Sequence, residues 1–357
     1  MSGRAPGNAL VPSPVSRKQR DRLNDVPVAV IGCGAHSTTT ILPALRHAPL
    51  RLIAVCDLDA DRAEAARVQF GAERTYQSIG DLLASATVEA VLVVGPPELH
   101  VAAGVAALES GHHVFVEKPP GSTLADAERL RVASEAAGRH VMVGFMKRHA
   151  TGYRLLKRIL AEPDFGDLTS ISYRFSHWAV DGIQLHLTDM SIHALDLVRW
   201  LAGDPVRMSV YKRARQGTNH SLAVMFDHAG ACVSQLDLSA FGPGVIEHLS
   251  ATGQQSNVDV DNLVLLSYAR HLAGLPEEAA NSRIVSSWSP EFALPDPEND
   301  SVVLQGYAGE LVEFAAAIQE DRAPNASIED GVAAMRLIEA IVAAPEGLTT
   351  VDLAAQL

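Results

Sequence analysis

Short apolar segments alternate with longer amphipathic segments from Val26 to Gly144. The apolar segments are rich in β-branched residues and lack a polar face, which is typical of strands buried in a parallel sheet. They predict strands at Val28–Ile31, Leu52–Cys56, Val91–Val94, Val114–Val116 and Val141–Val143, with a short edge strand at Arg74–Tyr76. The intervening segments predict helices at Ser37–His47, Asp59–Phe70, His100–Leu108 and Ser122–Gly138. This alternation predicts an α/β fold with a doubly wound parallel sheet.

The pattern changes after Phe145. Apolar and polar positions alternate with a period of two, which predicts strands at Leu168–Trp178, Met208–Arg213, Ser221–Phe226, Cys232–Leu238, Val245–Ser250 and Val258–Leu266. Helical periodicity predicts helices at Leu155–Leu160, Leu187–Leu201, Gly306–Gln319 and Ile328–Ala344. The second half is therefore expected to be an α+β domain dominated by an antiparallel sheet.

Prolines and glycines mark several ends of these elements. Pro27 is expected to precede the first strand, because a proline can open a strand but not lie within it. Pro43 is expected to kink its helix or to begin a new one. Gly71 is expected to end the helix that precedes it.

The chain has 357 residues and a formal net charge of -13, from 42 acidic and 29 basic residues. Its length suits two domains, which we expect at residues 26–147 and 148–357, after a flexible tail at 1–25. The negative charge disfavours nucleic acid and anionic membranes as partners. Three cysteines, no signal peptide and no apolar stretch long enough to span a bilayer favour a cytoplasmic protein with reduced thiols.

A glycine-rich turn follows the first strand and opens a helix. Its residues match G-x-G-x-x-G except at the last position: Gly32, Cys33, Gly34, Ala35, His36 and Ser37. Glycines permit the tight turn, and the N–H groups at a helix start can bind a pyrophosphate. An ordinary turn between strand and helix would also explain the pattern, but its place in the sheet favours a dinucleotide.

The acidic residue expected to bind the ribose of such a cofactor is Asp57, at the end of the second strand. Leu58 follows it, with no Arg or Ser beside it to receive a 2′-phosphate, so NAD is expected rather than NADP. Asp57 could instead cap the next helix, a role that Asp59 can also fill.

Two further loops follow the third and fourth strands. Pro96, Pro97 and His100 lie on the first and are expected beside the cofactor, although a structural role for His100 would fit equally. Glu117 and Lys118 lie on the second and are also expected there. A partly desolvated lysine beside a nicotinamide can lower the pKa of a substrate hydroxyl or polarise a carbonyl. Taken alone, the Glu-Lys pair would be a surface ion pair.

Asp189, His193 and Asp196 have the spacing of one helix face. An acid and an imidazole four residues apart on an apolar helix suit general acid/base chemistry. A solvent-facing ion pair or a core histidine would also explain them. No metal is expected, because His186 and His193 are seven residues apart and no H-E-x-x-H pattern occurs.

Together these motifs resemble the Gfo/Idh/MocA oxidoreductase family. The resemblance is carried by Gly32-Cys33-Gly34, by Glu117-Lys118-Pro119, and by Asp189–Asp196, which follows D-x-G-x-H-x-x-D with Ser191 in place of the glycine. It implies an N-terminal Rossmann domain and a C-terminal domain with a large open, mostly antiparallel sheet. Such a sheet often forms homodimers or homotetramers. Ser191 could narrow the substrate pocket.

The resemblance also implies NAD(P)-dependent hydride transfer on the hydroxyls of sugars, cyclitols and their derivatives, with Lys118, Asp189 and His193 as catalytic residues. His193 would take the hydroxyl proton, Lys118 would stabilise the alkoxide, and Asp189 would orient His193 or bind a neighbouring hydroxyl. The family often has Asn-x-Arg where this chain has Met146-Lys147-Arg148, which leaves the contacts there open. Further candidates for the substrate pocket are Lys147, Arg148, Trp178 and His186.

Two other functions remain open at this stage. One is an aldose-ketose oxidoreductase that keeps NADP tightly bound. The other is a non-catalytic NAD-binding sensor, against which the lysine and histidine argue.

Overall fold

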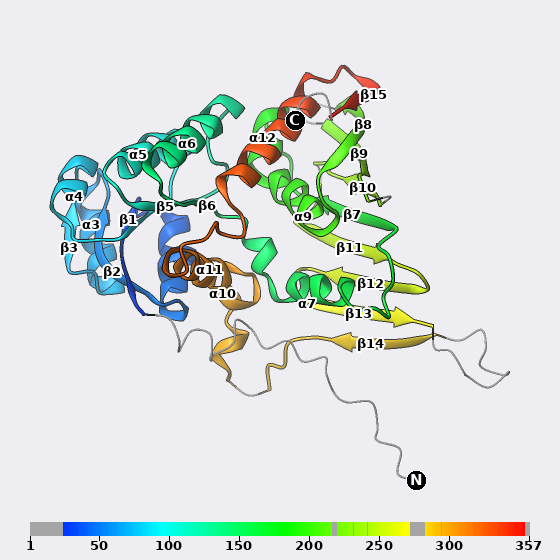
Figure 1. Cartoon of the computed structure of the whole chain (residues 1–357), viewed down its shortest axis with the longest axis horizontal. Coiled ribbons are helices and arrows are strands. Elements are labelled where there is room, and N and C mark those ends of the chain that lie inside the picture. Colours follow the sequence, from blue (N-terminus) through cyan, green and yellow to red (C-terminus); the bar gives the residue numbers. More distant parts are fainter. Residues whose placement is uncertain are drawn as a thin grey trace, which may run out of the picture.

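The computed structural model describes residues 24–215, 220–230, 232–240, 242–271, 283–293 and 295–353. They form two sheets that lie side by side, each with its own helices (Figure 1). The predicted tail at 1–25 lies outside the described residues except for Asn24 and Asp25, and the backbone of Asn24 is bonded to the side chain of Gln319. Among the described residues, no helix is long and apolar enough to cross a membrane.

The first sheet has six parallel strands in the order β3-β2-β1-β4-β5-β6. The strands are β1 Val26–Ile31, β2 Leu50–Cys56, β3 Arg74–Tyr76, β4 Ala90–Val93, β5 His113–Val116 and β6 Val141–Val143. This order confirms the predicted doubly wound sheet. The chain reverses direction across the sheet between β1 and β4, and ligands bind outside the carboxyl ends of the strands at such a point.

Helices connect these strands, as the sequence predicts, with α4 as an addition. They are η1 Ser37–Ile41, α2 Leu42–Ala44, η2 Leu45–His47, α3 Ala60–Phe70, α4 Ile79–Ser85, α5 Pro97–Glu109 and α6 Leu124–Ala137. Pro43 lies in α2 directly after the π-helical turn η1, so the hydrogen-bonding pattern of the helical segment changes next to the residue that lacks an N–H. The carboxylate of Asp59 caps α3, and Gly71 ends it in the left-handed conformation with φ 76°.

The second sheet has nine strands in the order β14-β13-β12-β11-β7-β10-β9-β8-β15, and only its β7–β10 pair is parallel. The strands are β7 Ser170–Ser176, β8 Pro205–Ala214, β9 His220–His228, β10 Val233–Asp237, β11 Ile246–Thr252, β12 Ser256–Asp261, β13 Leu265–Arg270, β14 Ile284–Trp288 and β15 Gly347–Asp352. The helical segments of this half are η3 Met146–His149, α7 Thr151–Leu160, α8 Ile183–His186, η4 Leu187–Ser191, α9 Ile192–Ala202, η6 Pro297–Asn299, α10 Ser301–Leu304, α11 Tyr307–Gln319 and α12 Ile328–Ala343. A large, mostly antiparallel sheet is thus confirmed.

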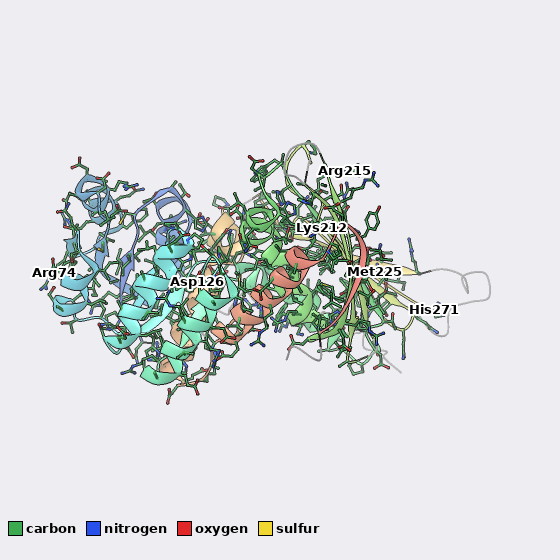
Figure 2. All side chains as sticks on the ribbon, turned by 90° about the horizontal axis from the view of Figure 1, so that it is seen from above. Arg74, Asp126, Lys212, Arg215, Met225 and His271 are labelled. Atoms are coloured by element: carbon green, nitrogen blue, oxygen red, sulfur yellow. The ribbon has the colours of Figure 1, made fainter. Side chains whose placement is uncertain are left out.

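Helices cover one face of this second sheet and leave the other face open. In β9, Leu222, Val224 and Phe226 are buried, whereas Met225 between them is 49% exposed. Figure 2 shows Lys212 on the helix side of the sheet and Met225 on the opposite side. The ammonium group of Lys212 accordingly donates to the carbonyl of Val342 in α12.

Two expectations about strands are wrong. Pro27 lies inside β1, paired with Arg51 of β2. The strand tolerates Pro27 because the N–H that a proline lacks would point toward β4. The pairing of β1 with β4 begins only at the next residue, Val28. The segment Val258–Leu266 is not one strand but the end of β12, a turn and the start of β13.

The helices α11 and α12 belong to the second half of the chain yet pack against the first sheet. The ring of Phe314 in α11 lies 6.0 Å from that of Phe115 in β5. The N–H of Val143 in β6 donates to the carbonyl of Ala326, just before α12, at 2.9 Å. The last part of the chain therefore completes the first sheet, and the domain limit at 147/148 stays a prediction.

Candidate active site

A cleft of about 490 Å³ opens at the carboxyl ends of β1, β4 and β5 and faces η4. The predicted residues that line it are Gly34, Ala35, His36, Ser37, Pro97, Glu117, Lys118 and Asp189. The cleft is also lined by Gly95 and Pro119, which lie on the two loops that the sequence predicts beside the cofactor, and by Val94, Leu185 and Thr188, which the sequence does not single out as site residues. Leu185 lies four residues before Asp189, so helical spacing from Asp189 is the signal that would have found it, whereas Thr188 is adjacent to Asp189 and no periodic signal points to it.

The glycine turn has the shape that a dinucleotide requires. Gly32 has φ +96°, and a Cβ there would lie 1.9 Å from the carbonyl oxygen of Val94, so no other residue fits. A Cβ on Gly34 would meet nothing within 4 Å, which leaves the backbone open to an approaching pyrophosphate. The first N–H groups of the helical segment that follows have no partner within the helix. These residues therefore fit the phosphates of NAD.

Asp57 holds the glycine turn and the start of the next helix together. Its Oδ2 accepts the N–H of Cys33 at 2.8 Å, and its Oδ1 accepts the N–H of Asp59 at 2.9 Å and lies 3.2 Å from a guanidinium nitrogen of Arg62. The side chain that caps α3 is that of Asp59, so Asp57 does not have the capping role that the sequence left open for it. Leu58 is 88% exposed and is not among the residues that line the cleft.

His100 is a structural link between two loops of the cleft. Its Nδ1 lies 2.8 Å from the carbonyl oxygen of Pro119 and its Nε2 accepts the N–H of Gly95 at 3.3 Å. The first contact needs a proton on Nδ1 and the second a lone pair on Nε2, so the ring is neutral. Burial lowers the pKa of His100 in agreement with this. Pro96 precedes α5 and is absent from the cleft lining.

Lys118 reaches across the cleft to Asp189. Its ammonium group donates to the carbonyl oxygen of Asp189 at 2.5 Å and lies 3.4 Å from the carboxylate oxygen Oδ1. Behind it, Glu117 accepts the N–H of Lys118 with Oε2 and Nε2–H of His36 with Oε1, both at 3.1 Å. Burial alone would raise the pKa of Glu117, but His36 and Lys118 hold it below its ordinary value. Glu117 is therefore an anion that fixes the lysine loop.

His193 is near enough to Lys118 for the charge of the lysine to act on its imidazole, but it is not among the residues that line the cleft. Its helix is not regular, because η4 is a turn of π-helix that contains Asp189 and ends where α9 begins. The side chain of Asp189 is 49% exposed, whereas His193 is 8% exposed. Within the described residues no hydrogen bond joins them, and Nδ1 of His193 is buried without a partner. Of the two roles expected for Asp189, binding a neighbouring hydroxyl is the one this geometry supports.

Burial and nearby cations keep His193 neutral. Desolvation is the main reason why the pKa of its imidazole lies well below the ordinary value, and the charges of Lys118 and Lys147 add to it. A neutral imidazole can accept a proton. Since Nδ1 is buried without a partner among the described residues, a role as proton acceptor falls to Nε2.

Lys147 is buried next to this site but is not part of the cleft lining. Its ammonium group forms an ion pair with Glu247 in β11 and lies 4.4 Å from the ring centre of Phe175. The other carboxylate oxygen of Glu247 accepts the hydroxyls of Tyr153 at 2.5 Å and Tyr173 at 2.7 Å. No sequence signal points to Glu247, because it lies a hundred residues from Lys147.

Arg148 uses its guanidinium group within the protein core. Two of its nitrogens bind both carboxylate oxygens of Asp196 at 2.8 and 2.5 Å. The remaining nitrogen donates to Asp330 at 3.0 Å and to Asn325 at 3.3 Å. This arrangement joins η3, α9 and α12, which supports a structural role rather than a substrate contact.

Trp178 and His186 lie on either side of a histidine that the sequence does not single out. His177, at the end of β7, has its ring centre 5.8 Å from that of Trp178 and 4.8 Å from that of His186. Trp178 is half exposed, whereas Nε2 of His186 lies 2.7 Å from the carbonyl oxygen of Leu238. Burial lowers the pKa of His186 to about 4, so its ring is neutral and donates. None of the three lines the cleft.

Comparison with known proteins adds relatives along nearly the whole chain. An inositol 2-dehydrogenase of Ralstonia nicotianae is 28% identical over 344 residues, which cover 89% of this chain and 93% of that protein. A crystal structure of a dehydrogenase from Chromobacterium violaceum superposes with a TM-score of 0.81 at 25% identity, over 89% of this chain and 95% of that chain. An Agrobacterium radiobacter oxidoreductase solved with NAD+, L-tartaric acid and magnesium has a TM-score of 0.79 at 20% identity, over 94% and 100%, and shows the same fold.

Two family models match successive parts of the chain. Residues 26–145 match the GFO_IDH_MocA oxidoreductase family with its NAD-binding Rossmann fold, and residues 153–255 match the GFO/IDH/MocA C-terminal domain. The glycine turn and the lysine loop lie in the first match, and Asp189 and His193 lie in the second. The chain is a member of the Gfo/Idh/MocA family of NAD-binding oxidoreductases.

Proposed function

We propose that this protein transfers a hydride between NAD and a secondary hydroxyl, or the corresponding ketone, of a sugar, cyclitol or amino-sugar derivative. The observation that carries the proposal is the contact of Lys118 with Asp189 at the cleft, with the neutral His193 beside them. The curated relatives named inositol 2-dehydrogenase support a cyclitol such as inositol as the first compound to test.

Three residues of the chain have separate roles around the reacting carbon. NAD, when bound, supplies the nicotinamide that accepts or returns the hydride. Nε2 of His193 takes the proton of the substrate hydroxyl, because its lone pair is free at neutral pH. The ammonium group of Lys118 stabilises the negative charge that develops on that oxygen. The exposed carboxylate of Asp189 binds a neighbouring hydroxyl and keeps Lys118 in place.

The test is turnover of a panel of cyclitols, sugars and amino sugars, with Lys118→Met as the diagnostic variant. We expect NAD-dependent oxidation of at least one compound, and a loss of kcat of roughly 10²–10⁴-fold in the variant, as is usual for an acid/base group. NAD binding by the variant, measured by calorimetry, controls for folding. A kcat within about tenfold of wild type would refute the role of Lys118. Binding of NAD without any turnover would favour the sensor function.

We propose NAD rather than NADP because Asp57 places a carboxylate at the end of β2, where it would repel a 2′-phosphate. NAD should therefore raise the unfolding midpoint more than NADP at equal concentration. Asp57→Ser should narrow that difference. Equal shifts with the wild-type protein would contradict the proposal, and NADP retained through purification would favour the aldose-ketose oxidoreductase.

We also propose a homodimer or homotetramer formed through the open face of the second sheet. Side chains that point out of that face include Tyr211 at 44% exposure, Met225 at 49% and Leu348 at 73%. Such apolar groups in adjacent strands are typical of an interface.

For the location of the protein in the cell we infer the cytoplasm, since Cys33, Cys56 and Cys232 are all free thiols.

A further inference from the structure

Glu310 in α11 is a buried carboxyl group with no assigned role. The residue is completely buried, and neither of its carboxyl oxygens has a hydrogen-bond partner among the described residues. A buried ionised carboxylate without partners is very costly, so such a group is expected to be neutral or to face another polar group. The surroundings of Glu310 indicate that it is neutral and that it also faces a second carboxyl group.

The packing of α11 against β5 places Glu310 opposite Glu117. Phe314 in α11 touches Phe115 in β5, with ring centres 6.0 Å apart. Glu310 lies one turn before Phe314 on the same face of α11, and Glu117 lies two residues after Phe115 on the same face of the strand. The charge of Glu117 accordingly acts on Glu310.

Among the described residues around this pair, no cation is left to neutralise Glu310. Tyr307, one turn before Glu310, has its ring centre 5.8 Å from that of His36, whose Nε2–H is already given to Glu117. From η3, the Cβ and backbone of His149 lie against the adjoining Gly309, and burial lowers the pKa of the His149 ring to about 3, so it carries no charge. Lys118 points into the cleft toward Asp189.

Two facing carboxyl groups in a buried site cannot both be ionised, and one of them keeps a proton. Glu117 is the ionised member, because both of its oxygens accept hydrogen bonds, from His36 and from the amide of Lys118. Burial, and then the charge of Glu117, raise the pKa of Glu310 well above its ordinary value. The neutral carboxyl of Glu310 therefore has one O–H to donate, and the carboxylate whose charge acts on it is that of Glu117.

We propose that Glu310 is a positioning residue of the NAD cleft: it keeps a proton, shares it with Glu117, and so holds Glu117 where it fixes the Lys118 loop and His36. The inference rests on the proposed role of Lys118, and on His36 and Lys118 lining the cleft. Loss of this proton at alkaline pH would place two anions side by side. Glu117 would then move, and both of its contacts would weaken.

Two variants separate this role from simple packing. Glu310→Gln keeps a neutral donor, whereas Glu310→Met keeps similar bulk and removes the donor. Glu313→Gln is the matched control, because Glu313 lies on the same helix and is bonded to Arg322 instead. The NAD dissociation constant, from titration of the purified protein, should rise roughly tenfold or more in Glu310→Met and stay within about threefold of wild type in Glu310→Gln and in the control.

The proton itself is detected by infrared spectroscopy of the protein without substrate. At neutral pH the wild-type spectrum should contain the carbonyl stretch of a protonated carboxyl group, which disappears in Glu310→Gln and persists in Glu313→Gln. Absence of that band, or NAD affinity in Glu310→Met equal to wild type, would overturn the proposal. If Glu310→Met does not fold, the comparison of this carbonyl band between the wild-type protein and Glu310→Gln tests the proposal by itself. Failure of the proposed hydride transfer would appear only in the substrate panel and would leave both readouts unchanged.

Discussion

His193 depends on its surroundings for the ability to accept a proton. Burial, followed by the charges of Lys118 and Lys147, lowers the pKa of its imidazole well below the ordinary value of 6.5. The acid limb of a plot of kcat/KM against pH reports the free enzyme's base. That limb is therefore expected below pH 6.5, so activity persists into mildly acidic solution.

Lys118→Met should shift this limb to higher pH, because it removes one of the charges that disfavour the imidazolium. The residual activity of the variant suffices to locate the limb. A wild-type limb at or above pH 6.5, or an unchanged limb in the variant, would contradict the role of His193 as the base.

Around His193, the sequence predicts the chemical groups of the cleft but not the partners of the neighbouring charged residues. The spacing of Asp189 and His193, and the motif that contains Lys118, identify the chemical groups of the cleft. The partners of Lys147 and Arg148 are different, since Glu247 and Asp330 lie far away in the sequence. Charged residues in a loop suggest a surface or a ligand, and only the packed fold reveals that both are neutralised inside the core.

At the scale of elements, Arg148 joins η3 to α9 and α12 through Asp196 and Asp330. Arg148→Met would leave the carboxylate of Asp196, which is 1% exposed, without its main partner. Removing one member of a buried ion pair typically costs about 3–5 kcal/mol, and we expect a loss of that size in the free energy of unfolding. Denaturant titration measures it.

The matched control is Arg129→Met, which breaks an exposed pair with Asp126 whose atoms lie 3.6 Å apart. Such surface pairs contribute about 1 kcal/mol or less. Adding Asp196→Asn to Arg148→Met should recover part of the loss, because it removes the unpaired charge. Equal effects of Arg148→Met and Arg129→Met would mean that the buried arrangement does not hold the three helical segments together.

Elements of the first sheet could be predicted well, because buried parallel strands produce unbroken apolar runs. Elements of the second half were harder to delimit. The predicted strand Val258–Leu266 contains a turn at Asn262 and Leu263, both of which have positive φ. The apolar pattern does not reveal this turn, because Leu263 packs inward like a strand residue. Its carbonyl oxygen accepts the N–H of Gly152. The π-helical turn that contains Asp189 likewise has no sequence pattern, since helical periodicity continues through it.

At the scale of the whole molecule, the open face of the second sheet is expected to bury Met225 against another copy. Met225→Lys places a charge there, and charged groups disfavour the core of an interface. The native mass from light scattering should fall to that of a single chain, or the dissociation constant between copies should rise at least tenfold. Val68→Lys, on the exposed side of α3, is the control and should change neither. An unchanged mass in Met225→Lys would place the interface elsewhere.

The contacts of α11 and α12 with the first sheet bear on how the protein is made. The ribosome releases the N-terminal part first, and domains generally fold as they emerge. Here all six strands of the first sheet emerge before Phe314 can cover Phe115 and before Ala326 can receive the N–H of Val143. The nascent cofactor half must therefore remain unfinished until nearly the entire chain has been synthesised. A prematurely terminated product that lacks these helices would expose apolar surface of the first sheet and leave the NAD cleft without their support.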